Sequence, residues 1–283
     1  MSKNKKMWLI IATSLIVVGM TMFVIAMSIN NWDFNKLNTA KYETNTYEID
    51  EQYTDIFLKS TTADVNFVIS QDGKCKVVCY EQESVKHSVQ VKNGVLNIKV
   101  DDQRKWYEHI GIAIGSPKVT IYLPAKDYVS NITIKTSTGD ISIEDMLVEK
   151  IDVTVTTGDV ILSDVNCKNN IKVEVTTGGT ILTDVKCKKI VTDGSTGDVS
   201  LKNVIVEDII SVERDTGDVK FNRCDAGEIS VETDTGDITG SLLTDKVFIT
   251  ETDTGKISVP KTSVGGRCEL STDTGDIKIK VVD

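Results

Sequence analysis

The sequence has little of what most active sites are built from. Among its 283 residues are only two histidines, His87 and His109, and three prolines. Two histidines leave almost no room for a histidine-rich metal site or for His-dependent catalysis. The sequence contains no G-x-S-x-G, P-loop, G-x-G-x-x-G or H-E-x-x-H motif. These absences predict a protein that is not an enzyme and that takes no cofactor.

Positive charge is also scarce, with 32 basic against 42 acidic residues and a formal net charge of -10. The first 30 residues contain Lys3, Lys5 and Lys6 but no acidic residue, so the rest of the chain is more acidic still. An acidic domain is not attracted to nucleic acid or to an anionic membrane face. We therefore expect no nucleic-acid partner.

One long apolar run stands near the N-terminus. Residues 7–29 carry no charge, and about 20 apolar residues suffice for a helix to cross the hydrocarbon layer. The lysines before this run place residues 1–6 in the cytoplasm and residues 31–283 outside, by the positive-inside rule. A cleaved signal peptide is the alternative, because Ala26-Met27-Ser28 has small residues at the right spacing. The run exceeds the ~7–15 residues of a signal peptide's apolar region, which favours a retained membrane anchor.

Aromatic residues almost disappear in the second half of the chain, since Phe221 and Phe248 are the only two in residues 129–283. A core of Ile, Val, Leu and Thr is typical of narrow stacked sheets. Residues 52–128 are richer in aromatics and include a hairpin signal, Asn93-Gly94, between two alternating runs at residues 88–100. Residues 30–51 are polar with weak periodicity, which predicts a stalk.

A Thr-Gly pair, usually followed by Asp, recurs every 19 or 20 residues. The turn glycines are Gly139, Gly158, Gly178, Gly197, Gly217, Gly236, Gly255 and Gly275. Seven positions earlier stand Ile132, Ile151, Ile171, Ile190, Ile210, Ile229, Phe248 and Cys268. Apolar residues alternate with polar ones on both sides of each turn, as strands require. Such a repeat cannot bury its apolar face alone, so neighbouring repeats must stack.

Two arrangements fit this repeat: a parallel β-solenoid with one repeat per rung, or an antiparallel meander with Thr-Gly-Asp hairpins. The same residue types recur at the same position of successive repeats, and parallel in-register stacking would place them directly on one another. This recurrence favours the solenoid. The predicted fold class is therefore all-β, a parallel β-solenoid or β-helix-like repeat domain behind a single N-terminal transmembrane helix. The predicted regions are a cytoplasmic tail (1–6), a transmembrane helix (7–29), a stalk (30–51), an N-terminal β region (52–128) and a solenoid of eight repeats (129–283).

Four of the six cysteines stand at apolar positions of the repeat: Cys167, Cys187, Cys224 and Cys268. This placement predicts small buried hydrophobic side chains. A disulfide between Cys167 and Cys187 in adjacent rungs is the alternative. Cys75 and Cys79 lie four apart on one strand face and cannot pair with each other. Neither pair has zinc-site spacing with histidine partners, so no metal site is expected among the cysteines.

Three segments together resemble a known family: Ser60 to Ile69 (STTADVNFVI), Ser116 to Pro124 (SPKVTIYLP) and Ile132 to Ile143 (ITIKTSTGDISI). They are similar to the bacterial "putative adhesin" family of β-strand-repeat proteins, a domain of unknown function with serial TGD turns. The resemblance covers about residues 50–283. It implies a solenoid-like extracytoplasmic domain, often behind one membrane helix, and it supplies no catalytic residues.

The sequence thus predicts a membrane-anchored binding, adhesion or scaffolding module of the bacterial cell envelope. Its partners would be the membrane, through residues 7–29, and a protein or cell-wall component whose identity the sequence does not give. A carbohydrate-active enzyme on a β-helix scaffold and a cation-stabilised structural rod are the alternatives. The enzyme would need two carboxylates in a cleft, and the repeats contain neither a break in pattern nor aromatic platforms.

A strip of outward-facing acidic residues precedes the last turns. It comprises Glu213, Asp215, Glu232, Asp234, Glu251, Asp253 and Asp273. A solvated acidic face is one interpretation, and a site for a divalent cation or a cationic partner is the other.

Two further expectations concern the solenoid itself. Residues 277–282 form the last strand in the sequence, so we expect an open edge there, guarded by Lys278 and Lys280, at which a partner strand could associate. Gly194 has no side chain, so we expect it to leave room for the aliphatic part of the Arg214 side chain in the next rung. The guanidinium of Arg214 is then expected to reach outward.

Overall fold

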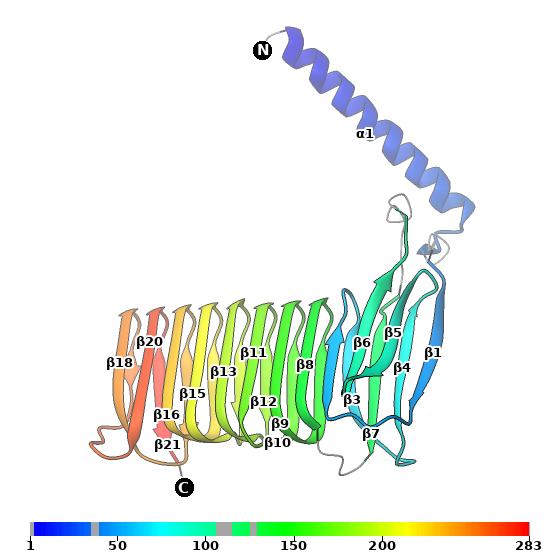
Figure 1. The fold of residues 1–283 in the computed structure, drawn as a ribbon. Helices are drawn as coiled ribbons and strands as arrows, with labels where there is room; N and C mark the ends of the chain where they lie inside the picture. Colours follow the sequence, from blue (N-terminus) through cyan, green and yellow to red (C-terminus); the bar gives the residue numbers. More distant parts are fainter. Residues whose placement is uncertain (1–2, 35–39, 106–114, 125–128, 283) are drawn as a thin grey trace. The chain divides into compact units, whose positions relative to one another are not determined.

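The computed structural model describes residues 3–34, 40–105, 115–124 and 129–282 (Figure 1). It divides into two compact units, Met1–Tyr42 with Arg104–Gly115, and Glu43–Gln103 with Ser116–Asp283. His109 lies outside the described residues.

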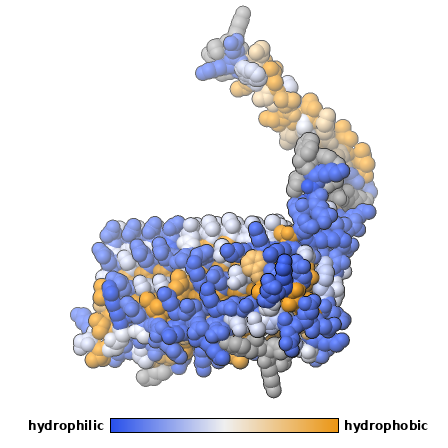
Figure 2. Space-filling view, in the orientation of Figure 1, coloured by the Kyte–Doolittle hydropathy of each residue, from blue (hydrophilic) through white to orange (hydrophobic). Residues whose placement is uncertain are grey.

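The first unit contains helix α1 (Lys3–Ile29). Most of its apolar side chains are exposed, although Met27 is buried, and Figure 2 shows apolar surface on this helix. The helix is long and apolar enough to span a membrane, although an N-terminal signal sequence would meet the same criteria.

The second unit consists of strands, which form one hydrogen-bonded network. Its first strands are β1 (Tyr42–Ile49), β2 (Asp55–Lys59), β3 (Asp64–Ser70), β4 (Cys75–Gln82), β5 (Val85–Lys92), β6 (Val95–Asp102) and β7 (Lys118–Pro124). The repeats contribute β8 (Val129–Thr138), β9 (Ile141–Thr157), β10 (Val160–Cys167), β11 (Asn170–Thr177), β12 (Thr180–Thr183), β13 (Lys186–Thr196), β14 (Val199–Lys202), β15 (Ile205–Thr216), β16 (Val219–Thr235), β17 (Ile238–Leu242), β18 (Lys246–Thr254), β19 (Ile257–Ser258), β20 (Gly266–Thr274) and β21 (Ile277–Val281).

Successive repeats pair in parallel and in register. Ile151 of β9 pairs with Ile171 of β11, which in turn pairs with Ile190 of β13. These isoleucines are fully buried, so each apolar position of one repeat packs on its counterpart in the next. The antiparallel meander is therefore wrong for these strands.

The turn glycines stack on one another. A Cβ atom built on Gly158 would lie 2.2 Å from the carbonyl oxygen of Gly139, and the same contact recurs along the column. Gly158 also has φ 142°, a value that side chains disfavour. Close backbone approach and backbone conformation both require glycine at this position.

The aspartate after the glycine also joins neighbouring repeats. Asp140 Oδ1 accepts a hydrogen bond of 2.8 Å from the backbone N–H of Asp159, and Asp159 Oδ1 accepts one of 2.7 Å from Gly179. Each carboxylate thus satisfies a turn N–H that the sheet ladder leaves unpaired. This aspartate ladder explains why Thr-Gly is usually followed by Asp.

The stack begins before residue 129, which corrects the predicted division into two β regions. β2 pairs in parallel with β8, and β3 pairs in parallel with β9. Ala63 and Asp64 occupy the turn, and Asp64 Oδ1 accepts a hydrogen bond from Asp140 N. The turn lacks glycine, and a long insertion separates it from the next repeat, so the period was hidden in the sequence.

Two other predictions for the N-terminal part differ in outcome. The Asn93-Gly94 hairpin is confirmed, because both residues have positive φ and β5 pairs antiparallel with β6. The stalk over residues 30–51 is wrong in part, because β1 pairs with β4. Side chains alternate in burial along β1, with Tyr47 and Ile49 packed against the core.

The order of the last repeats differs from their order in the sequence. β20 pairs with β16 on one side and with β18 on the other, and β21 likewise lies between β17 and β19. Figure 1 shows β18, in orange, at the end of the row and β20, in red, inside it. The predicted open edge at residues 277–282 is therefore wrong, because Ile277 and Lys278 pair on both sides.

All six cysteines are buried free thiols. The prediction of small buried side chains is thus confirmed, and the alternative Cys167–Cys187 disulfide is not formed. Cys167 Sγ instead donates to the carbonyl oxygen of Glu149 at 3.2 Å.

Candidate functional site

The structure places the predicted acidic strip on the outside of the repeats, with all seven carboxylates exposed. Glu213 pairs with Glu232, but the neighbour of Glu232 on the other side is Ser271, not Glu251. Ser271 therefore interrupts the glutamate row because β20 lies between β16 and β18. Among the described residues, the strip is not one of the groups whose ligand atoms converge as a metal site would require.

The open edge lies at β18 and β19. Among the described residues, β18 pairs only with β20, and β19 pairs only with β21. Val247, Ile249 and Ile257 are exposed there, and Figure 2 shows apolar surface at this end of the row. An edge strand offers unpaired backbone N–H and C=O groups to a partner strand.

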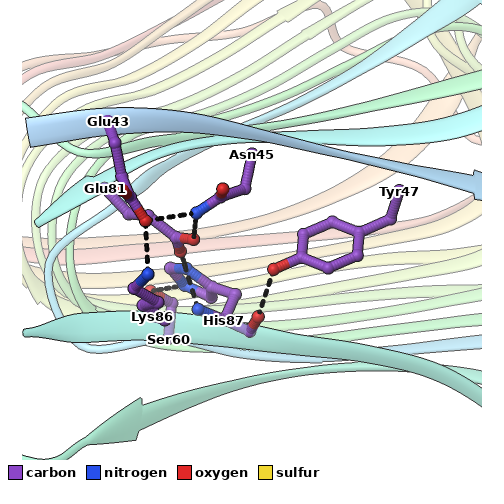
Figure 3. A network of polar contacts seen from close by, with 7 residues as sticks. All are labelled: Glu43, Asn45, Tyr47, Ser60, Glu81, Lys86 and His87. Carbon is purple, nitrogen blue, oxygen red and sulfur yellow. Dashed lines mark hydrogen bonds and ion pairs between the residues drawn. The ribbon is translucent and has the colours of Figure 1, made fainter. Parts of the chain in front are cut away.

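A buried polar cluster lies at the opposite part of the unit, where β1, β4 and β5 meet (Figure 3). Its centre is a contact between Glu81 and His87, whose side chains are 1% and 3% exposed. Glu81 Oε2 lies 2.7 Å from His87 Nδ1 and accepts a hydrogen bond of 2.6 Å from the backbone N–H of His87. This contact fixes the start of β5 against β4.

Polar groups from β1 and from the residue that follows β2 complete the polar cluster. Asn45 Nδ2 donates to Glu81 Oε1 at 2.8 Å, and Ser60 Oγ lies 3.1 Å from His87 Nε2. Tyr47 OH donates to the carbonyl oxygen of His87 at 3.0 Å. Burial and then the charge of Glu81 raise the pKa of Tyr47, so its hydroxyl keeps the proton that this bond needs.

Cys79 belongs to the same cluster. It lies two residues before Glu81 on β4, so both side chains point inward, and Cys79 is fully buried. One ligand atom each from Cys79, Glu81 and His87 lies within 4.8 Å of the others. Burial and then the charge of Glu81 raise the pKa of the Cys79 thiol to about 12, so the thiol is protonated at neutral pH.

This cluster was not predicted from the sequence. A signal was present, because Glu81 continues the inward-facing series of Cys75, Val77 and Cys79, and a carboxylate on an inward face requires a partner. His87 follows six residues later, across the turn between β4 and β5. Spacing along the sequence alone does not reveal that this turn brings the two side chains together.

The fold defines a class of proteins, in which short strands stack on one another mostly in parallel and in register. The sequence profile of the Toastrack DUF4097 family, a solenoid-like fold, matches residues 53–283. The chain belongs to this family, as the resemblance predicted. No curated protein matches the sequence.

Several solved structures are similar to this chain at low sequence identity. A "putative adhesin" from Bacteroides fragilis is 18% identical with a TM-score of 0.50, and the match covers 85% of this chain and 97% of that chain. A cell adhesion protein from Clostridium sporogenes, also described as putative, is 14% identical with a TM-score of 0.38, covering 86% and 100%. A protein from Parabacteroides distasonis described as lipid binding is 12% identical with a TM-score of 0.35, covering 87% and 98%.

Proposed function

We propose that this chain is a single-pass membrane protein whose residues 31–283 form an extracytoplasmic parallel β-solenoid, and that it acts by binding at the cell envelope rather than by catalysis. Helix α1 supplies the anchor, and Lys3, Lys5 and Lys6 on its N-terminal side favour a cytoplasmic N-terminus. The in-register parallel pairing of successive repeats supports the solenoid.

The observation that carries the binding proposal is the open edge at β18. Its outward residues are Val247 and Ile249, followed by Glu251 and Asp253, all exposed. A matching occupant is an extended segment of another envelope protein, with apolar residues and then basic residues at alternate positions. It would add to the sheet as a further strand.

A second copy of this chain fits the same edge less well. In parallel orientation it would set Glu251 against Glu251 and Asp253 against Asp253, and directly opposed like charges destabilise a sheet. In antiparallel orientation across the full strand it would set Val247 against Asp253. Charge therefore favours a different protein as the partner.

Site-specific photo-crosslinking in living cells tests this function. A photoreactive residue replaces Ile249, which is 46% exposed on the open edge, or Ile181, which is 38% exposed on β12 between two paired strands. We expect one discrete adduct from position 249 and none from position 181. Equal labelling at both positions, or none at either, would contradict the proposal, and an adduct of twice the chain's mass would show self-association instead.

A further inference from the structure

The polar cluster at the meeting of β1, β4 and β5 contains three different metal-binding groups. A thiol, a carboxylate and an imidazole converge there on strands β4 and β5, each almost completely buried. Zinc accepts sulfur, nitrogen and oxygen ligands at about 2.0–2.3 Å, and this mixed set is softer than the all-oxygen sites of calcium or magnesium. We propose that Cys79, Glu81 and His87 bind a zinc ion.

The atoms that would not contact the zinc ion are already held by neighbours. His87 Nε2 faces Ser60 Oγ at 3.1 Å, which leaves Nδ1 for the metal. Asn45 Nδ2 donates to Glu81 Oε1 at 2.8 Å, and Oε2, which accepts the backbone N–H of His87 at 2.6 Å, has a second lone pair for the metal. Protein zinc sites hold the second atom of a ligating histidine or carboxylate in this way.

Only a small movement separates this arrangement from a coordinated one. Glu81 Oε2 and His87 Nδ1 are now 2.7 Å apart, as a hydrogen bond requires. Two ligands of a tetrahedral zinc ion lie about 3.3–3.8 Å apart, given bonds of that length. The two atoms would therefore have to separate by about 0.6–1.1 Å, which small rotations of the two side chains can supply.

Proton and charge balance are favourable. The Cys79 thiol gives its proton to solvent and binds as thiolate, and Glu81 binds as carboxylate. The proton between His87 Nδ1 and Glu81 Oε2 in their hydrogen bond moves to His87 Nε2 or to solvent, so that His87 binds through Nδ1 as neutral imidazole with its one proton on Nε2, which donates to Ser60 Oγ. Two negative ligands neutralise Zn²⁺, so the buried complex carries no net charge and avoids the cost of an unpaired buried ion. The neighbouring lysine, Lys86, is bound by Glu43 on β1.

The test measures zinc and cobalt binding by the full chain in detergent. The protein is stripped with chelator, incubated with zinc chloride and desalted, and bound zinc is counted by mass spectrometry. We expect one zinc ion per chain, and at least a tenfold lower affinity in Cys79→Ser and His87→Gln. Cys224→Ser is the control, because Cys224 is equally buried but belongs to no such group in the part of the chain that the structure describes.

Cobalt substitution keeps the outcome clear if a variant fails to fold. Co²⁺ in the parent protein should give an intense thiolate-to-cobalt absorption, which Cys224→Ser retains and folded Cys79→Ser loses. Absence of retained zinc, or absence of that absorption in the parent, overturns the proposal. Undiminished zinc binding by folded Cys79→Ser overturns it as well.

Discussion

The guanidinium of Arg214 occupies the space that a side chain at Gly194 would fill. A Cβ atom built on Gly194 would lie 1.9 Å from Arg214 Nη1, and the two residues pair in register across β13 and β15. Arg214 is 2% exposed, and its Nη2 donates to Thr180 Oγ1 at 2.9 Å. The predicted juxtaposition is therefore confirmed, but the guanidinium points inward rather than outward.

This relationship predicts a large effect of Gly194→Ala. The new methyl group would collide with Arg214 and also with the carbonyl oxygen of Val175, 1.9 Å away. Because a backbone atom cannot easily move aside, we expect a loss of about 1–3 kcal/mol in the free energy of unfolding, measured by urea denaturation. Gly179→Ala is the control, since its nearest neighbours lie 3.5 Å from the new Cβ atom. Equal stability of the two variants would contradict this account.

The aspartate ladder predicts that one substitution stabilises the protein. Gly179 stands where other repeats have Asp, so the ladder has no carboxylate there to accept the N–H of Asp198. Gly179→Asp fits without collision and should add about 1 kcal/mol, the usual contribution of one hydrogen bond to a charged acceptor after the repulsion between neighbouring carboxylates is subtracted. Gly179→Ala should gain only about 0.5 kcal/mol, from reduced freedom of the unfolded chain.

Comparison of the two Gly179 variants separates these causes. Both are compared with the parent by thermal and urea unfolding. A larger gain for Asp than for Ala supports the ladder, whereas an Asp variant no more stable than the Ala variant would show that the carboxylate makes no useful bond.

The sequence predicted the repeat well because its period is visible at single positions. Turn glycines such as Gly158 are required by both backbone conformation and stacking, so they mark the turns from Gly139 to Gly275. The order of the last repeats could not be predicted, because Phe248 and Cys268 are both apolar and either could pack on Ile229. The turn at Ala63 was hidden because it lacks glycine, and the polar cluster because Glu81 and His87 meet only through tertiary structure.

Asp276 predicts a specific acid sensitivity. A hydrogen bond from Lys278, followed by one from the backbone N–H of Lys256, lowers the pKa of Asp276 below its usual value. A carboxyl with a lowered pKa in the folded state stabilises the protein above its unfolded-state pKa, and this contribution disappears as pH falls through the folded-state value. We therefore expect Asp276→Asn to flatten the fall in thermal midpoint between about pH 5 and pH 2.

The control for this prediction is Asp273→Asn, which removes an exposed carboxylate from the same β20–β21 repeat. Thermal midpoints of both variants and the parent are measured across the same pH series at constant ionic strength. The interpretation fails if Asp273→Asn flattens the curve as much as Asp276→Asn.

The order of the last strands can be tested by disulfide trapping. Thr235 pairs with Thr274, and Thr274 pairs with Thr254, so neighbouring Cα atoms lie about 4.8 Å apart. Thr235 and Thr254 are separated by an intervening strand, about 9.6 Å, which is too far for a disulfide. All three side chains are exposed, and the native cysteines are buried. Mild oxidation should therefore form a disulfide in the Thr235→Cys/Thr274→Cys double variant and in the Thr254→Cys/Thr274→Cys double variant. It should form none in the Thr235→Cys/Thr254→Cys double variant.

The three double variants are matched controls for one another, because each contains two exposed cysteines at equivalent positions of the repeat. Peptide mapping without reduction identifies the links. Stacking in sequence order would give the opposite pattern for two of the pairs: Thr235→Cys would link to Thr254→Cys and not to Thr274→Cys. In that case β18 would no longer be the open edge, and the binding surface would have to be sought on β20 and β21.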